Sequence, residues 1–262
     1  MPTTTSKQKR NGKRTRNLFD PSSKKPFQLS RSKIDLFQQC RRCFHLDRRL
    51  GVARPRMPPF TLNSAVDALL KREFDEYREQ QRPHPIMVEN QIDAVPFQHP
   101  DLDTWRSNFK GVRFHHEPTN LIISGAVDDV WINPKGELLI VDYKATASKE
   151  RLITLDTKWR QGYKRQLEIY QWLFRMNGFS VSNSSFIVYA NAEKDRDAFN
   201  GELKFKLQLI EHVGDTEWVE QTVIDAHACL MSDEIPDAAD DCEYCGYWEA
   251  ALEVTGRALV SE

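Results

Sequence analysis

The chain has 262 residues, of which 40% are hydrophobic and 29% charged, so it can bury a core as one large domain or two small ones. No apolar run approaches bilayer length, and the polar N-terminus lacks the apolar stretch of a signal peptide. We therefore expect a cytoplasmic protein with no membrane partner. The net charge of −1 conceals an asymmetry, because residues 1–56 hold 16 Lys/Arg against 3 Asp/Glu.

The basic N-terminal segment is predicted to be disordered. Between Lys7 and Lys25 it is rich in Lys, Arg, Ser and Thr and has few apolar residues, so it cannot bury enough surface to fold alone. We therefore predict a disordered basic tail over residues 1–26. Such a tail suits non-specific contact with phosphates and the release of their counterions. The alternatives are a solubility tail or a charge run like those of ribosomal proteins, neither of which would contact phosphates here.

Two helices are predicted after the tail. The first lies within the segment Leu29–Leu50 and follows Ser30, which can cap it. Its apolar side chains recur with the spacing of one helix face, at Ile34, Phe37, Cys40 and Phe44. The second covers about residues 62–79. Residues 82–112 show no clear pattern, and the histidines of this region and the next lack ligand spacing, so we expect them on the surface or in packing roles.

A β-hairpin is predicted over residues 125–144. Its second strand is apolar up to Val141 and then polar, and Asp142 and Lys144 share one face because side chains alternate along a strand. We place Asp128 on the preceding strand. Carboxylates and an ammonium at the end of a buried strand suit a divalent metal beside a phosphate. The alternative is a surface ion pair between Asp142 and Lys144.

A helix, two strands and a further helix are predicted after the hairpin. Gln166 and Tyr170 lie four residues apart and share one face of the first helix. The predicted ranges are 161–177 for that helix, 185–191 for a central strand, 202–211 for an edge strand and 216–230 for an amphipathic helix.

Taken in order, these motifs resemble the PD-(D/E)xK nuclease superfamily, and within it the RecB-type branch. That branch includes the AddB nuclease domain and the iron–sulfur nucleases of CRISPR adaptation. It reads Gly-x-x-Asp, then Asp-x-Lys, then a helix with Gln-x-x-x-Tyr. The matching residues here are Gly125 to Asp128, Asp142-Tyr143-Lys144, and Gln166 to Tyr170.

The resemblance implies an α/β fold with a mixed central sheet flanked by helices, like a restriction endonuclease. It also implies that Asp128 and Asp142 bind Mg²⁺ or Mn²⁺, and that Lys144 orients a water or the phosphate. Gln166 and Tyr170 would hold the lysine or the DNA backbone.

The sequence departs from the branch on the second helix, where Asp67 stands at the place of a metal-binding histidine. Asp67 is either a further metal ligand or a solvated carboxylate.

Five cysteines are present, and four of them form two Cys-x-x-Cys pairs. The pairs are Cys40 with Cys43 and Cys242 with Cys245, which together supply four ligands for tetrahedral Zn²⁺ or a [4Fe–4S] cluster. The resemblance favours the cluster, which that branch holds with one N-terminal and three C-terminal cysteines. Here the division is two and two, so structural Zn²⁺ stays an alternative, as do unpaired thiols. Cys229 is expected to be buried and not to be a metal ligand.

We predict a single nuclease domain over residues 27–262 in which the cysteine site joins the N- and C-terminal segments. Its parts are an N-terminal helical part over 27–81, a catalytic core over 113–211 and a C-terminal helix and Cys-x-x-Cys segment over 212–262. The predicted function is a metal-dependent DNA nuclease in repair, recombination or defence against mobile elements. The alternative is a catalytically silent, nuclease-like DNA-binding module that acts with a helicase or a repair complex.

Overall fold

A computed structural model describes residues 13–55, 58–148, 155–157 and 160–256. The chain forms two compact units. The first, the sheet unit, comprises Pro26–Asp35 and Pro58–Val223. The second, the cysteine unit, comprises Met1–Lys25, Leu36–Met57 and Ile224–Glu262. The sequence predicts one domain over residues 27–262. The residues of this predicted domain are divided between the two units. None of the helices described is both long enough and apolar enough to cross a membrane.

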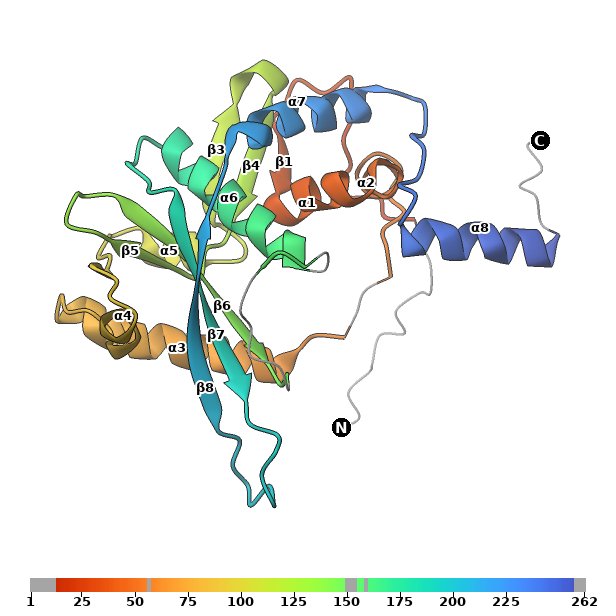
Figure 1. Cartoon of the computed structure of the whole chain (residues 1–262). Coiled ribbons are helices and arrows are strands. Elements are labelled where there is room, and N and C mark those ends of the chain that lie inside the picture. The colour runs from red at the N-terminus through yellow and green to blue at the C-terminus, as the bar shows by residue number, and fades with distance from the viewer. Residues whose placement is uncertain (1–12, 56–57, 149–154, 158–159, 257–262) are drawn as a thin grey trace, which may run out of the picture. The chain divides into compact units, whose positions relative to one another are not determined.

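The sheet unit contains a mixed five-stranded sheet in the order β2-β5-β6-β7-β8 (Figure 1). Its strands are β2 (Val95–Pro96), β5 (Asp129–Ile132), β6 (Leu138–Thr146), β7 (Ser184–Ala192) and β8 (Phe205–Val213). β5 and β6 form the predicted antiparallel hairpin, with Val130 opposite Ile140. β6 and β7 run parallel, with Asp142 opposite Ile187, and β8 is the antiparallel edge strand. The mixed sheet and the central place of β7 agree with the sequence prediction.

A smaller three-stranded sheet in the same unit was not predicted. It has the order β1-β4-β3, with β1 (Phe27–Ser30) parallel to β4 (Leu121–Gly125) and β3 (Val112–His116) antiparallel to β4. Leu29 and Ile123 pair in register and are fully buried, so burial fixes this pairing of distant segments.

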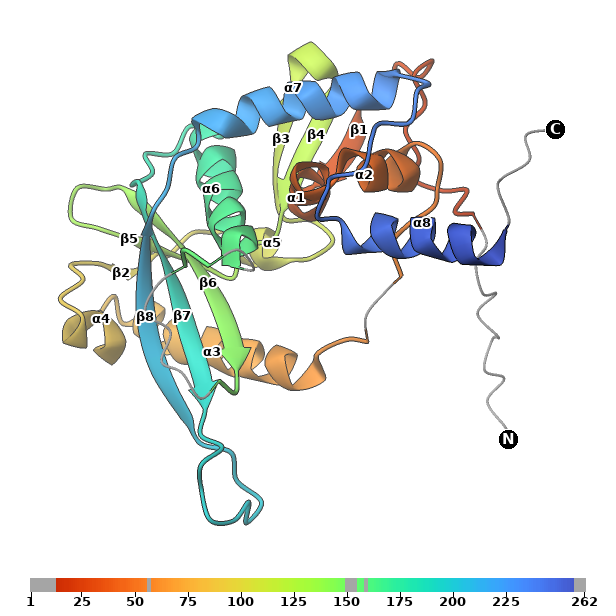
Figure 2. The same ribbon diagram turned by 45° about the vertical axis from the view of Figure 1, so that its right-hand side comes forward.

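Two long helices cover opposite faces of the five-stranded sheet (Figure 2). One is α3 (Thr61–Glu79), whose Leu70 and Phe74 pack in a buried cluster with Val141 and Tyr143 of β6. The other is α6 (Gln161–Met176), which faces the alternate side chains of β6, as its Gln166–Asp142 hydrogen bond shows. The remaining helices are α1 (Arg31–Gln39), α2 (Arg41–Arg48), α4 (Pro85–Glu89), α5 (Leu102–Arg106), the 3₁₀ helix η1 (Glu117–Thr119), α7 (Glu217–Met231) and α8 (Glu243–Thr255).

The single helix predicted within residues 29–50 is wrong. The segment begins with β1 and then forms two helices separated at Cys40, whose backbone is extended (φ −166°, ψ 112°). The Cys40 sulfur accepts a hydrogen bond from the Cys43 backbone N–H at 3.5 Å and so caps α2. The break therefore sets the first Cys-x-x-Cys pair at the start of a helix rather than in the middle of one.

Part of the predicted disordered tail makes defined contacts within the cysteine unit. Residues 1–12 lie outside the described residues. The Arg14 backbone N–H donates to the Gly51 carbonyl at 2.9 Å, and the Phe19 N–H donates to the Arg48 carbonyl at 2.8 Å. Phe19 is buried, with its ring edge-on to His227 at 5.8 Å between centroids. Phe19 and these backbone bonds anchor a segment whose average composition predicts disorder.

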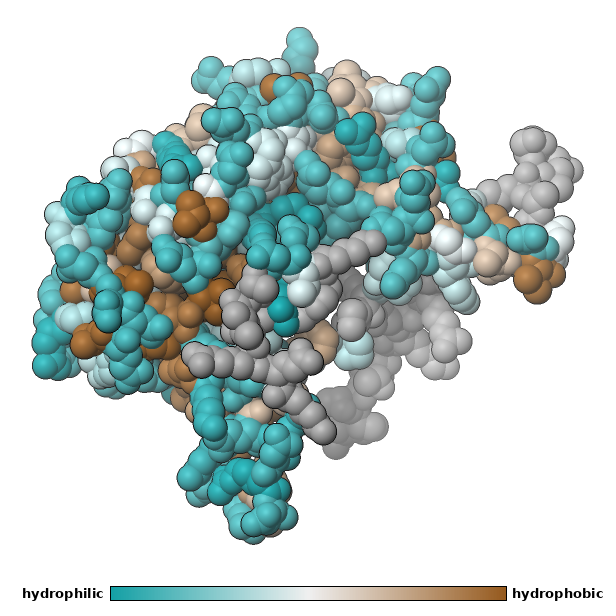
Figure 3. Space-filling model, viewed as in Figure 1, coloured by the Kyte–Doolittle hydropathy of each residue, from teal (hydrophilic) through white to brown (hydrophobic). Residues whose placement is uncertain are grey.

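β7 and β8 lead into a projecting loop over residues 193–204 (Figure 1). On the face seen in Figure 3, hydrophilic side chains cover this projection, whereas hydrophobic ones gather beside the five-stranded sheet. Asn200 and Gly201 have positive φ (47° and 76°) and make the turn at its tip.

Candidate active site and four-cysteine centre

The C-terminal half of β6 carries a carboxylate and an ammonium to the side of the sheet that α6 covers. Asp142 is 1% exposed and forms an ion pair with Lys144, two residues further on. From α6, Gln166 Nε2 donates to Asp142 Oδ1 at 2.6 Å and also lies 3.4 Å from the Tyr170 hydroxyl. The predicted residues of β6 and α6 therefore lie together.

Asp128 lies beside these residues but not on a strand. It occupies the connection between β4 and β5, one residue before β5, which corrects its predicted place on the hairpin strand. Its Oδ2 accepts the Tyr143 backbone N–H at 3.0 Å, a bond that ties it to β6. Asp128 and Asp142 also interact directly through their carboxyl groups.

A buried network next to Asp128 fixes the backbone at this point. Asp129 is fully buried and forms ion pairs with Arg78 of α3 and, at 2.9 Å, with Arg106 of α5. Its other oxygen accepts the Tyr143 hydroxyl at 2.7 Å. Arg106 Nε also donates to the Asp128 carbonyl at 3.0 Å. Helices α3 and α5 and strand β6 thus hold the residue pair Asp128-Asp129.

A second lysine, which was not predicted, reaches the site from α3. Lys71 Nζ lies 2.8 Å from Asp67 Oδ2 and 3.4 Å from Asp128 Oδ1. The sequence carries a signal for it, because Lys71 is four residues after Asp67 and so lies on the same helix face. Among the residues that the structure describes, Asp67, Asp128 and Asp142 do not form a group of three that could hold a metal ion.

An open cavity of about 370 Å³ gives access to this cluster. Its polar walls include Asp67, Asp128 and Lys144, and Phe60 lies at its edge with 64% of its surface exposed. Asn63 is also part of the lining and donates to the Ala145 carbonyl at 2.9 Å. The cavity therefore joins charged groups to an exposed aromatic ring.

Burial and the neighbouring charges shift the pKa values of Asp142, Asp128 and Lys144 in opposite directions. Burial, and then the nearby Asp128 charge, raises the pKa of Asp142 to about 7, although Lys144 acts against this. Burial alone would raise the pKa of Asp128, but the charges of Lys144 and Lys71 outweigh it and the pKa is lowered. Burial would lower the pKa of Lys144, but Asp142 and Asp128 outweigh it and the pKa is raised. The two carboxyl groups therefore differ in proton affinity.

Gly125 allows α6 to approach the site closely. A Cβ atom at this position would lie 2.4 Å from Cε1 of Tyr170, well inside contact distance. The Arg31 guanidinium, from α1, lies 5.9 Å from the centre of the same tyrosine ring. The absence of a side chain at Gly125 is thus what lets Tyr170 pack beside Asp128 and Asp142.

The carboxylates fit a hard divalent cation. Asp142 Oδ2 is buried and accepts no hydrogen bond of normal geometry; it faces the Lys144 ammonium. Asp128 offers a second carboxylate directly beside it. Oxygen ligands of this type are those that Mg²⁺ and Mn²⁺ prefer.

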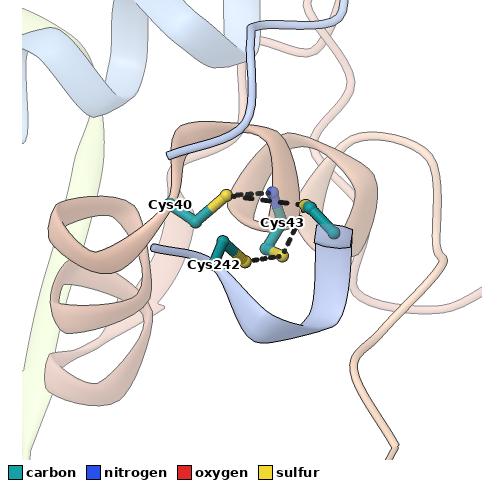
Figure 4. Close-up of side chains that lie close together, drawn as sticks. Cys40, Cys43 and Cys242 are labelled. Carbon is teal, nitrogen blue, oxygen red and sulfur yellow. Dashed lines mark hydrogen bonds between the residues drawn. The ribbon is translucent and has the colours of Figure 1, made fainter. Parts of the chain in front are cut away.

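The four cysteines of the two Cys-x-x-Cys pairs come together in the cysteine unit. Their sulfur atoms all lie within 4.8 Å of one another, and all four residues are buried. Figure 4 shows the side chains of Cys40, Cys43 and Cys242 turned toward one another. The Cys43 sulfur lies 3.5 Å from that of Cys242 and 3.6 Å from that of Cys245, and Cys40 and Cys245 are 3.8 Å apart.

The fifth cysteine and the histidines lie outside this group. Burial raises the pKa of Cys229, which is half-buried rather than fully buried. His84 stacks on Phe74 at 4.2 Å and lies 2.9 Å from a Glu73 oxygen, and His99 stacks on Trp105 at 4.3 Å. These histidines have packing roles, as the sequence predicted.

Comparisons with known proteins point to one family. The family model of the PD-(D/E)XK nuclease superfamily matches residues 28–250. A search of curated proteins finds no match. Among solved structures, the crystal structure of SSO0001 aligns at 16% sequence identity over 85% of this chain and 84% of that chain, with a TM-score of 0.31. A score this low supports no inference about function, whereas the family match covers most of the chain.

Proposed function

Since the chain belongs to the PD-(D/E)XK nuclease superfamily, we propose that it is a deoxyribonuclease that hydrolyses phosphodiester bonds with Mg²⁺ or Mn²⁺. The observation that carries the proposal is that Asp128 and Lys144 line one open cavity, while the buried Asp142 pairs with Lys144 and interacts with Asp128. Two adjacent carboxylates and a lysine are the groups that metal-assisted phosphate hydrolysis needs.

Asp128 and Asp142 are the residues we propose to hold the divalent ion. Such an ion lowers the pKa of bound water and stabilises negative charge on the phosphate. The hydrogen bond from Gln166 to Asp142 and that from the Tyr143 N–H to Asp128 orient the two carboxylates. Asp67 is a weaker candidate ligand, because Asp67, Asp128 and Asp142 do not form a group of three that could hold one ion in the part of the chain that the structure describes.

Lys144 is proposed to neutralise charge that develops on the phosphate or to orient the attacking water. Its ammonium faces Asp142 and lies 5.2 Å from the centre of the Tyr163 ring, so it has a defined place beside the carboxylates. Gln166 and Tyr170 are proposed to position Asp142 and, through it, the lysine.

We further propose a biological setting and partners from the motif order alone. The Gly-x-x-Asp, Asp-x-Lys and Gln-x-x-x-Tyr pattern supports a place in the RecB-type branch. DNA repair, recombination or defence against mobile elements are settings that suit such an enzyme, and a helicase is a suitable partner protein.

A nuclease assay with Mn²⁺ on single- and double-stranded DNA tests the proposal. The purified full chain should cleave DNA, and Asp142→Asn or Lys144→Ala should reduce the rate by at least about 100-fold without loss of DNA binding. Matched controls are Asp197→Asn and Lys135→Ala, whose side chains are exposed and lie in turns away from the cavity lining.

Two outcomes would contradict the proposal. DNA binding without cleavage by the wild-type chain would favour the catalytically silent binding module. Cleavage that persists at the wild-type rate in both site variants would place the reaction elsewhere in the molecule.

A further inference from the structure

Each Cys-x-x-Cys pair of the cysteine unit lies at the start of a helix. Cys40 is the N-cap of α2 and Cys242 is the N-cap of α8, and Cys43 and Cys245 follow in the first turns. Backbone N–H groups at a helix N-terminus stabilise nearby negative charge. The Cys43 N–H directed at the Cys40 sulfur at 3.5 Å is one such group. The N-termini of α2 and α8 thus both favour the thiolate form of the cysteines that lie there.

The sulfur separations match one tetrahedral metal ion. Four thiolates at about 2.3 Å from a single Zn²⁺ have neighbouring sulfurs about 3.8 Å apart. The observed separations are 3.5, 3.6 and 3.8 Å, and all four sulfurs lie within 4.8 Å of one another. They are too long for disulfide bonds, whose sulfurs are about 2.05 Å apart.

The same separations do not fit a [4Fe–4S] cluster. Each of its four cysteines binds a different iron, so iron and sulfide atoms occupy the space between the thiolates. The thiolates of such a cluster must therefore lie much farther apart than the 4.8 Å limit that all four sulfurs satisfy here. Binding of a [4Fe–4S] cluster would require the N-termini of α2 and α8 to move apart.

A neighbouring arginine offsets the charge that a zinc–thiolate centre keeps. Four thiolates and one Zn²⁺ carry a net charge of −2. Arg54 Nη2 lies 3.4 Å from the Cys242 sulfur, and the guanidinium is held over the Tyr244 ring at 4.6 Å. Hydrogen bonds of this kind from outside the ligand set orient the ligands and stabilise a metal site.

We propose that Cys40, Cys43, Cys242 and Cys245 bind a single structural Zn²⁺, with Arg54 as the outer partner that stabilises it. The inference goes beyond the proposed nuclease function and does not depend on it. Zn²⁺ has no redox chemistry, so the centre is a joint between two distant chain segments and not an electron-transfer or redox-sensing site. Because its ligands are about 200 residues apart, its binding energy contributes directly to folding.

Metal analysis of the full chain is the decisive experiment. The protein is produced with both iron and zinc supplied and is purified without oxygen, and metals and acid-labile sulfide are then measured. The expected result is about one zinc per chain, no sulfide and no brown colour. Iron with matching sulfide would overturn the proposal, and so would a folded wild-type chain without metal.

Variants test the ligands and Arg54 separately. Cys242→Ser should lose the zinc, whereas Cys229→Ser should retain it. Because Cys242→Ser can also fail to fold, Arg54→Gln supplies a test that keeps all four ligands: it should release zinc to a chelator several-fold faster than wild type. The matched control is Arg49→Gln, which removes an ion pair with the exposed Asp233 and leaves all four cysteines and Arg54 in place. Equal release rates for both arginine variants would refute the role of Arg54.

Discussion

At the scale of single residues, Gly125 links the packing of α6 to the candidate site. Gly125→Ala places a Cβ atom 2.4 Å from Cε1 of Tyr170, so the tyrosine must shift. Overpacking of this kind costs about 1–3 kcal/mol in the free energy of unfolding. We expect that loss in urea unfolding together with a lower cleavage rate. Gly246→Ala is the control, because its Cβ meets nothing within 4 Å. Equal effects of the two substitutions would contradict this account.

The raised pKa of Asp142 predicts how stability depends on pH without metal. Burial and Asp128 raise this pKa to about 7 in the folded protein, against about 3.9 in the unfolded chain. Between these values the folded state holds the proton and the unfolded state releases it, so stability falls as pH rises. We expect Tm measured with a chelator to fall from about pH 4 toward pH 7, and Asp142→Asn to reduce the slope.

The effect of a divalent metal ion on Tm at two pH values tests whether Asp142 causes that pH dependence. Because Mg²⁺ or Mn²⁺ binds the ionised carboxylates, the ion should raise Tm more at pH 8 than at pH 5. A metal-induced rise in Tm that is equal at both pH values would show that Asp142 does not bind the ion.

At the scale of secondary-structure elements, the Asp129 network joins α3, α5 and the hairpin. Asp129 and Asp75 together compensate the buried charges of Arg78 and Arg106, and of the two carboxylates Asp129 is the fully buried one. Removal of one partner from a buried ion pair costs about 3–5 kcal/mol. We therefore expect Asp129→Asn to lower the free energy of unfolding by about that amount in urea titrations. Asp103→Asn, at an exposed position of α5, should change it by less than about 0.5 kcal/mol. A mild effect at Asp129 would mean that Asp75 alone compensates the two arginines.

The elements that the sequence predicted well are those with a strong period. α3, α6, α7, β7, β8 and the β5–β6 hairpin occur within a few residues of their predicted ranges, because alternating or helical spacing extends over each of them. Short strands such as β1 could not be predicted. Its four residues have no period of their own, and they are ordered by pairing with β4, whose residues lie about 94 positions later.

In the candidate site, too, the residues on elements with a regular side-chain period were the ones that the sequence predicted. Asp142 and Lys144 were placed correctly because a strand fixes which side chains share a face, and Gln166 meets Asp142 as the motif order implied. The break at Cys40 was missed because nothing in its neighbours disfavours a helix; the sulfur cap and the partner cysteines produce it. Tertiary contacts of this kind are absent from local sequence patterns.

At the scale of the whole molecule, the basic N-terminal segment predicts salt-dependent DNA binding. Deletion of residues 1–12 removes Lys7, Lys9 and Arg10, and we expect the slope of log K against log salt to fall by about 0.9 for each phosphate that the shortened protein no longer neutralises. Deletion of residues 1–25 should additionally lower Tm, because it removes the buried Phe19. Binding measured at several salt concentrations checks the first effect, and thermal melts check the second. Identical salt slopes for all three chains would exclude the segment from DNA binding.

The order of synthesis has a consequence for the four-cysteine centre. Cys43 and Cys242 are 199 residues apart, and ribosomes add ~5–20 residues per second, so the second pair is made roughly 10–40 s after the first. During that interval the nascent chain carries two thiols whose partners do not yet exist. Translation speed therefore sets how long these thiols are open to oxidation or to capture of the wrong metal. Slowly translated copies should need the most protection from both.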